Sequence, residues 1–122
     1  MTKDLDTTIT LTGKSGKEYE FKLSTFDSFD DVKDGFTGHG LYVFTKRYKD
    51  GTEYKHSLIY LGMATSLDTR FEGHHKEQCI KNNGANCLGI HHMNNSTKEG
   101  RKAAESDILA ANNFTCNDQE NK

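Results

Sequence analysis

Two apolar runs joined by a turn signal constrain the fold of this chain more than any other feature of its sequence. Residues 40–44 read Gly-Leu-Tyr-Val-Phe and residues 58–62 read Leu-Ile-Tyr-Leu-Gly, and both runs are typical of buried β-strands. The polar interval between them contains Asp50-Gly51, a dipeptide that favours the tight turn of a β-hairpin. The pattern therefore predicts an antiparallel strand pair with a tyrosine on each strand.

A second hairpin is predicted near the N-terminus. Apolar and polar residues alternate over residues 9–11 and 19–23, on either side of the turn-forming residues 13–16. The acidic segment that follows, residues 24–38, carries apolar side chains spaced like one face of a short helix or wound loop: Phe26, Phe29, Val32 and Phe36. We expect this N-terminal part to pack on the core and to contribute stability without catalytic residues.

The remaining patterns complete an α+β fold. We expect a helix from Leu67 to Asn83, a third short strand over residues 87–93, and a second helix from about Thr97 to Asn112. The prediction is a small, mostly antiparallel central sheet flanked by helices. It divides the chain into an N-terminal hairpin extension (1–37), a main domain (38–117) and a disordered tail (118–122).

Composition excludes several classes of protein. The chain has 122 residues, 33% of them hydrophobic and 28% charged, which is low in hydrophobicity but outside the disordered class. No apolar run approaches the roughly 18–20 residues of a membrane span, and the N-terminus lacks the apolar core of a signal peptide. Three cysteines, an odd number, argue against a disulfide framework. We therefore expect one cytoplasmic domain with reduced thiols and no membrane partner.

The net charge of −2 is unevenly distributed. Residues 40–105 hold ten Lys/Arg and seven Asp/Glu, and the rest of the chain holds six and eleven. A mildly basic central region permits phosphate binding. Around the Asp50-Gly51 turn, and on the second predicted helix, we expect cations that contact nucleic acid: Lys46, Arg47, Lys49, Lys55 and Arg101. A solvated hairpin end is the alternative interpretation of the four cations near the turn.

The two tyrosine-containing tripeptides resemble the signature of the GIY-YIG nuclease family. Gly40-Leu41-Tyr42 matches the first tripeptide and Tyr60-Leu61-Gly62 the second, with leucine in place of isoleucine in both. Arg70, eight residues after Gly62, falls at the family's arginine position. Met63 stands where some members carry lysine or another polar residue. The resemblance covers about residues 38–117 and implies the family's fold.

The resemblance also implies a metal-dependent endonuclease that hydrolyses DNA phosphodiester bonds. Glu105 matches the family's metal-binding glutamate and would hold a single Mg²⁺, for which Mn²⁺ can substitute. Arg70 would hold the phosphate, and two tyrosines would position the attacking water. The catalytic set implied by the family is Tyr42, Tyr60, Arg70, His74, Glu105 and Asn117.

A non-cleaving module on the same fold, which binds nucleic acid or a protein partner, is the alternative function. Retention of the family positions argues against it, whereas Met63 and the net acidic charge argue for it. Duplex DNA is the predicted partner, with RNA and single strands left open. The sequence predicts neither the oligomeric state nor which of Tyr42, Tyr60 and His74 is the general base.

Overall fold

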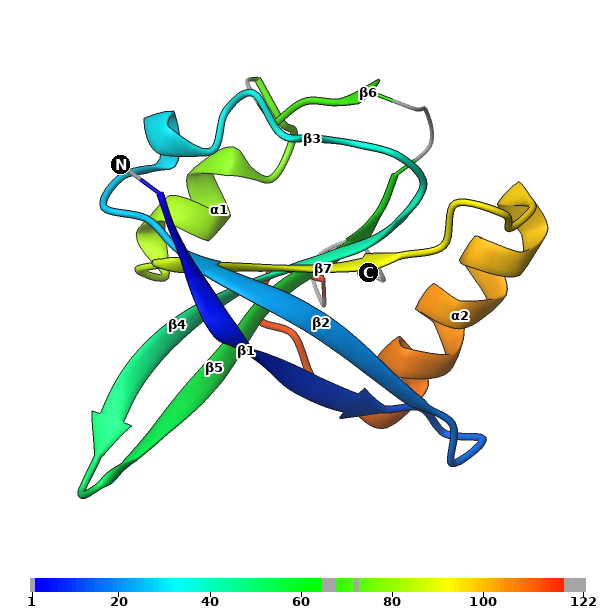
Figure 1. The fold of residues 1–122 in the computed structure, drawn as a ribbon, viewed down its shortest axis with the longest axis horizontal. Coiled ribbons are helices and arrows are strands. Elements are labelled where there is room, and N and C mark those ends of the chain that lie inside the picture. Colours follow the sequence, from blue (N-terminus) through cyan, green and yellow to red (C-terminus); the bar gives the residue numbers. More distant parts are fainter. Residues whose placement is uncertain (1, 65–67, 72, 118–122) are drawn as a thin grey trace.

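The computed structural model describes residues 2–64, 68–71 and 73–117, and the predicted disordered tail lies outside these ranges. The described chain forms a five-stranded sheet, a two-stranded sheet and two α-helices (Figure 1). In these residues no helix is both long and apolar enough to cross a membrane. In chain order the elements are β1 (Lys3–Thr12), β2 (Glu18–Thr25), the 3-10 helix η1 (Phe29–Asp31), β3 (Phe36–Thr37), β4 (Gly40–Asp50), β5 (Glu53–Met63), β6 (Asp68–Thr69), α1 (Glu77–Asn82), β7 (Cys87–His92) and α2 (Lys98–Ala111).

The large sheet has the order β1-β2-β7-β4-β5, and its neighbouring strands all pair antiparallel. Both predicted hairpins are confirmed, as are the third strand and the second helix, so the chain has the predicted α+β class. Strand β2 pairs with β7 from Lys22↔Ile90 to Thr25↔Cys87. The N-terminal hairpin therefore continues the central sheet instead of packing against it as a separate addition.

The central strands are buried on both faces, which explains why their sequences are continuous apolar runs. One face carries Tyr42, Phe44 and Tyr60, and it packs against the N-terminal segment and α1 through Phe26, Phe29, Val32, Phe71 and Ile80. The opposite face carries Leu41, Val43 and Leu61, and it packs against α2 and the C-terminal segment through Ala104, Ile108 and Phe114. The two motif tyrosines thus share a face.

The predicted helix from Leu67 to Asn83 is wrong over most of its length. Residues 65–67 and 72 lie outside the described residues, but Asp68–Thr69 form β6, which pairs with β3, and only Glu77–Asn82 are α-helical. The backbone N–H of Phe71 donates to the carbonyl oxygen of Lys33 (2.9 Å). Gly73 has a φ of +72°, a conformation that interrupts a helix. Arg70 and His74 consequently lie on an irregular segment between β6 and α1.

The prediction of reduced thiols is wrong for two of the three cysteines. Cys79 on α1 and Cys116 form a disulfide, and Cys87 is free and buried. The backbone N–H of Cys116 donates to the carbonyl oxygen of Ile59 on β5 (2.8 Å). An odd cysteine count is compatible with one pair and one free thiol. The pair joins α1 to the C-terminal segment that lies along β5.

Asp107 on α2 fastens the turn of the N-terminal hairpin to the helix. Its carboxylate accepts hydrogen bonds from the hydroxyl of Ser15 (2.7 Å), the backbone N–H of Ser15 (2.9 Å) and the hydroxyl of Tyr19 (2.9 Å). The Ser15 hydroxyl, foremost, holds the pKa of Asp107 below its ordinary value. Burial, followed by the bond to Asp107, raises the pKa of Tyr19. The hairpin is therefore anchored at both its sheet edge and its turn.

Candidate active site

Five of the six residues predicted to be catalytic line one cleft of about 420 Å³. Tyr42 comes from β4, Tyr60 from β5 and Glu105 from α2. Arg70 and His74 come from the segment between β6 and α1. Met63, Thr69 and His75 complete the lining. The cleft thus collects residues that are up to 63 positions apart in the sequence.

A hydrogen bond joins a buried tyrosine of the cleft to a half-buried histidine. The hydroxyl of Tyr42 lies 2.8 Å from Nε2 of His74. The backbone N–H of Lys76 donates to Nδ1 of the same ring (3.0 Å), so Nδ1 acts as an acceptor and the neutral imidazole carries its proton on Nε2. His74 therefore donates to the oxygen of Tyr42, the arrangement that stabilises negative charge on that oxygen.

Aromatic rings hold the polar groups of the cleft in place. Tyr42 and Tyr60 are only 4% and 5% exposed, with ring centroids 6.1 Å apart. The His74 ring stands edge-on to Tyr60 (5.2 Å) and stacks on the exposed ring of His75 (4.6 Å, 16° between planes). Because these side chains pack on one another, their hydroxyl and imidazole groups are positioned before any ligand binds.

A glycine is needed beside Tyr42 for steric reasons. Gly62 lies directly opposite Tyr42 in the β4–β5 pair. A Cβ atom at position 62 would overlap the hydroxyl end of the Tyr42 ring. The second tripeptide therefore requires glycine so that the tyrosine of the first can lie across the strand. Gly62 was recognised in the sequence as part of the second tripeptide, but nothing in the sequence indicated that it contacts the Tyr42 ring.

Arg70 is held by the N-terminal segment, which the sequence did not predict. Its Nη2 donates to Oδ1 of Asp34 (3.1 Å), and the flanking residues are fixed by the β3–β6 pairing and by the Phe71–Lys33 hydrogen bond. The side chains of Arg70 and Asp34 are 57% and 78% exposed, respectively. Such an exposed ion pair contributes at most about 1 kcal/mol. A stronger anion can therefore displace Asp34 from the guanidinium.

Replacing Asp34 with asparagine is expected to tighten binding of a phosphate polyanion by about two- to fivefold at low ionic strength, because a carboxylate that competes for Arg70 is removed. The gain should shrink as salt is raised. Fluorescence anisotropy with a labelled duplex measures it. Asp30→Asn is the matched control, since Asp30 is an exposed aspartate of the same segment. Weaker binding by Asp34→Asn than by Asp30→Asn would show that Asp34 orients Arg70 instead of competing for it.

Glu105 supplies a carboxylate to the cleft from the middle of α2. Its side chain is half-buried, on the turn of the helix that follows Arg101. Within the described residues no group of three or more His, Cys, Asp and Glu side chains is arranged to hold a metal ion. Glu105 is also the one carboxylate among the described residues that line the cleft, so a metal there would have this single carboxylate ligand from them, with water and substrate oxygens filling the remaining positions.

Two predicted site residues lie elsewhere. Asn117 is buried away from the cleft lining, where its side-chain amide pairs with the backbone N–H (2.7 Å) and carbonyl (2.9 Å) of Leu61. It holds the C-terminal segment against β5, one residue from Tyr60. Arg101 is only 4% exposed, and its Nη1 donates to the carbonyl and hydroxyl oxygens of Ser96 (2.9 and 3.1 Å). The prediction that Arg101 contacts nucleic acid is therefore wrong, because the guanidinium is covered.

The other four predicted nucleic-acid contacts lie on the outer half of the β4–β5 hairpin, outside the cleft. Lys46, Lys49 and Lys55 are exposed and Arg47 is partly exposed. Next to Arg47, the pKa of His56 is lowered by burial and, to a smaller extent, by the Arg47 guanidinium. The ring of His56 shares a hydrogen bond with the hydroxyl of Thr45 (2.8 Å).

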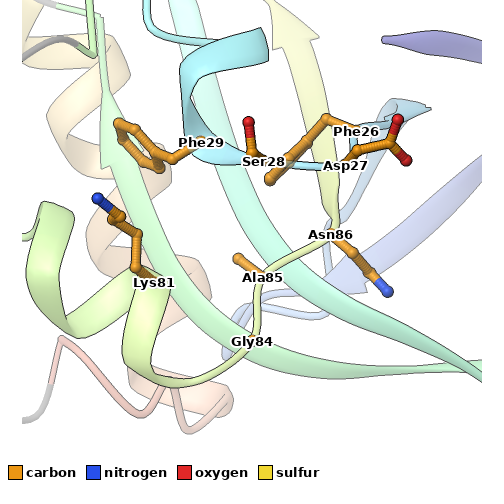
Figure 2. Close-up of a pocket in the computed structure, with 8 residues that line it drawn as sticks. All are labelled: Phe26, Asp27, Ser28, Phe29, Lys81, Gly84, Ala85 and Asn86. Atoms are coloured by element: carbon orange, nitrogen blue, oxygen red, sulfur yellow. The ribbon is translucent and has the colours of Figure 1, made fainter. Parts of the chain in front are cut away.

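A second cavity, of about 370 Å³, shares no lining residue with the cleft. Figure 2 shows Phe26 and Phe29 on one wall and Lys81, Gly84 and Ala85 on the other. Its polar groups already have partners: Lys81 pairs with Glu77 (3.4 Å), and the Asn86 amide binds the backbone of Arg47. These contacts give no reason to assign a ligand to it.

Comparisons with protein-family models, with curated proteins and with solved structures found no match to this chain. The resemblance to GIY-YIG nucleases therefore rests on the motif positions themselves and on what the cleft can do chemically.

Proposed function

We propose that this chain is a metal-dependent endonuclease of the GIY-YIG type that hydrolyses DNA phosphodiester bonds. The observation that carries the proposal is the cleft itself, because Tyr42, Tyr60, Arg70, His74 and Glu105 line it together. A carboxylate, a guanidinium and an oriented hydroxyl are the groups that hydrolysis of a phosphodiester requires. The GIY-YIG fold and the role of each residue belong to this proposal.

Arg70 binds the scissile phosphate. Its guanidinium is permanently charged and planar, so it can contact two phosphoryl oxygens at once and stabilise the charge that builds on them. Asp34, its ion-pair partner in the structure, is exposed and yields to the phosphate. Arg70 therefore fixes the phosphate at the mouth of the cleft.

Tyr42 orients and deprotonates the attacking water. It does so as a phenolate whose own hydroxyl proton has already passed to solvent, and the Nε2–H of His74 donates to that oxygen and stabilises its negative charge. His74 does not act as the base itself. Its Nε2 already carries the proton of the neutral ring, and its Nδ1 accepts the hydrogen bond from the Lys76 N–H. Tyr60, packed edge-on to His74, keeps the imidazole in this orientation and lines the water's approach.

Glu105 fits a Mg²⁺ ion, with Mn²⁺ as a substitute. Mg²⁺ prefers oxygen ligands, keeps several of its waters and is often bound through one or two carboxylates together with substrate phosphates. A half-buried carboxylate beside the phosphate site meets that description. When bound, the ion would neutralise charge on the phosphate and assist the leaving oxygen.

Duplex DNA is the proposed substrate and the cytoplasm the proposed location. Disulfides are usually transient in that compartment. The bond between Cys79 and Cys116 would therefore exchange with the surrounding thiol pool there.

The test is cleavage of supercoiled plasmid by the purified chain. We expect nicked and then linear product with Mg²⁺ or Mn²⁺ and none with EDTA, because the carboxylate site must be filled for turnover. An unrelated protein purified in parallel controls for contaminating nucleases. Failure to cut duplex, single-stranded or RNA substrates with either metal, together with retained binding, would replace this proposal with the non-cleaving module.

A further inference from the structure

We propose that the outer half of the β4–β5 hairpin is a two-stranded ribbon that enters the major groove of duplex DNA next to the cleft. The ribbon consists of residues 46–50 and 53–57. This inference deepens the proposed nuclease function, on which it rests, by assigning the element that recognises a duplex.

The ribbon projects from the sheet. Strand β7 pairs with β4 only from Gly40↔His92 to Thr45↔Cys87, whereas β4 and β5 pair with each other as far as Asp50↔Glu53. Figure 1 shows the resulting arm, with β4 and β5 extending together away from both helices. A two-stranded antiparallel ribbon is one of the two protein elements that the major groove of B-DNA admits.

One face of the ribbon has the chemistry for reading bases. Arg47 lies opposite His56 and Lys49 lies opposite Tyr54, so these side chains share a face. The Arg47 guanidinium lies over the Tyr54 ring, 3.6 Å from its centroid. This contact restrains the planar guanidinium, and its N–H groups make no hydrogen bond within the described residues. A stiffened arginine fork of this kind matches the O6 and N7 acceptors of guanine.

Two exposed tyrosines on the ribbon also favour contact with DNA. Tyr54 is 54% exposed and Tyr48 41% exposed, and they are the exposed large hydrophobic residues of the described chain. Tyrosine hydroxyls are among the side-chain groups that hydrogen-bond the phosphates and sugars of DNA. Both tyrosines stand on this ribbon, one on each face.

The charge of the ribbon favours a polyanion. It holds four Lys/Arg and two Asp/Glu, in a chain whose net charge is −2. Lys55 pairs with Asp50 (2.7 Å), whereas Lys46, Arg47 and Lys49 form no ion pair with the described residues. Glu53 is the one remaining acid. Three available cations on a narrow arm complement the phosphates that flank a groove.

The length of the arm fixes where it contacts DNA. Tyr54 lies six positions before Tyr60 along β5. At about 3.3 Å per residue the two lie about 20 Å apart, which corresponds to about six base pairs of B-DNA. The ribbon should therefore protect bases about six pairs to one side of the cut.

The test measures duplex binding in a Glu105→Gln background, which does not cleave. Arg47→Ala and Tyr54→Ala should each weaken binding of a 30-base-pair duplex, the first by about tenfold or more. Lys14→Ala removes an equivalent cation from the other hairpin turn and is the control, with an expected change below about twofold. Glu53→Gln should tighten binding by about two- to threefold. Thermal unfolding checks that each variant is folded.

Dimethyl sulfate protection supplies a second readout that does not depend on affinity. Guanine N7 atoms about six base pairs from the cut should be protected by the intact ribbon and exposed with Arg47→Ala. Equal losses for Arg47→Ala and Lys14→Ala, no protected guanine, or a larger loss on single strands than on duplexes would each overturn the ribbon proposal. Ribbon variants that bind and cut like the unmutated protein would contradict the ribbon proposal and leave the proposed nuclease function standing. Ribbon-dependent duplex binding without any cleavage would support the ribbon proposal and contradict the proposed nuclease function.

Discussion

Replacing Glu105 with glutamine is expected to abolish cleavage and to leave DNA binding unchanged or slightly tighter. The substitution keeps the shape of a half-buried helix residue, so the fold should survive. Among the described residues it removes the only carboxylate that lines the cleft, and with it the proposed metal ligand. Loss of one group that stabilises transition-state charge typically costs 10²–10³-fold in rate. Single-turnover cleavage and anisotropy, both in Mg²⁺, separate the two effects.

The matched comparisons make this result interpretable. Glu99→Gln changes the same residue type at an exposed position of the same helix and should leave cleavage unchanged. Arg70→Ala should lower both cleavage and binding, because the guanidinium contacts the phosphate in the ground state as well. Small, equal effects of Glu105→Gln and Glu99→Gln on cleavage would place the chemistry outside this cleft.

Local sequence patterns predicted the elements that are stabilised locally. Both hairpins follow from alternating or apolar runs around a turn signal, and β4 and β5 close at Asp50-Gly51 as the dipeptide indicates. Strand β7 and helix α2 likewise appear within one or two residues of their predicted bounds. In each case the apolar spacing and the turn or cap chemistry favour the same structure.

The segment that carries Arg70 could not be predicted this way, because contacts with residues about 35 positions earlier determine its structure. Its apolar residues have helical spacing, yet β6 pairs with β3 and the Phe71 N–H bonds to Lys33. Tertiary hydrogen bonds therefore override a helical pattern here. Asp34 was missed for the same reason, since no local spacing connects it to Arg70.

Burial was the other quantity that the sequence did not supply. Arg101 and Asn117 are polar residues at positions where solvent or substrate contact was expected, and both are at most 4% exposed. The family resemblance implied a catalytic role for Asn117, and in the structure its side-chain amide pairs with the backbone of Leu61. The other five residues of the predicted catalytic set share the cleft because the two tyrosines lie on adjacent strands with α2 packed on the same sheet.

Gly62→Ala is expected to reduce the cleavage rate by about 10²-fold or more, although it replaces no charged side chain. The added methyl group would overlap the hydroxyl end of Tyr42, so that ring must move and its bond to His74 breaks. Loss of an oriented general base costs about 10²–10⁴-fold. Overpacking at this buried position should also lower the free energy of unfolding by about 1–3 kcal/mol. Single-turnover cleavage and denaturant unfolding measure the two effects.

A double-mutant cycle distinguishes displacement of Tyr42 from general damage. Tyr42→Phe removes the hydroxyl and should reduce cleavage by a similar factor. If Gly62→Ala acts by displacing that hydroxyl, the double variant will cut no more slowly than the worse single variant. Gly100→Ala, a glycine-to-alanine change on α2 with only a mild contact to Thr97, should leave cleavage intact. Multiplicative losses in the double variant would contradict the mechanism, because Gly62 and Tyr42 would then act independently.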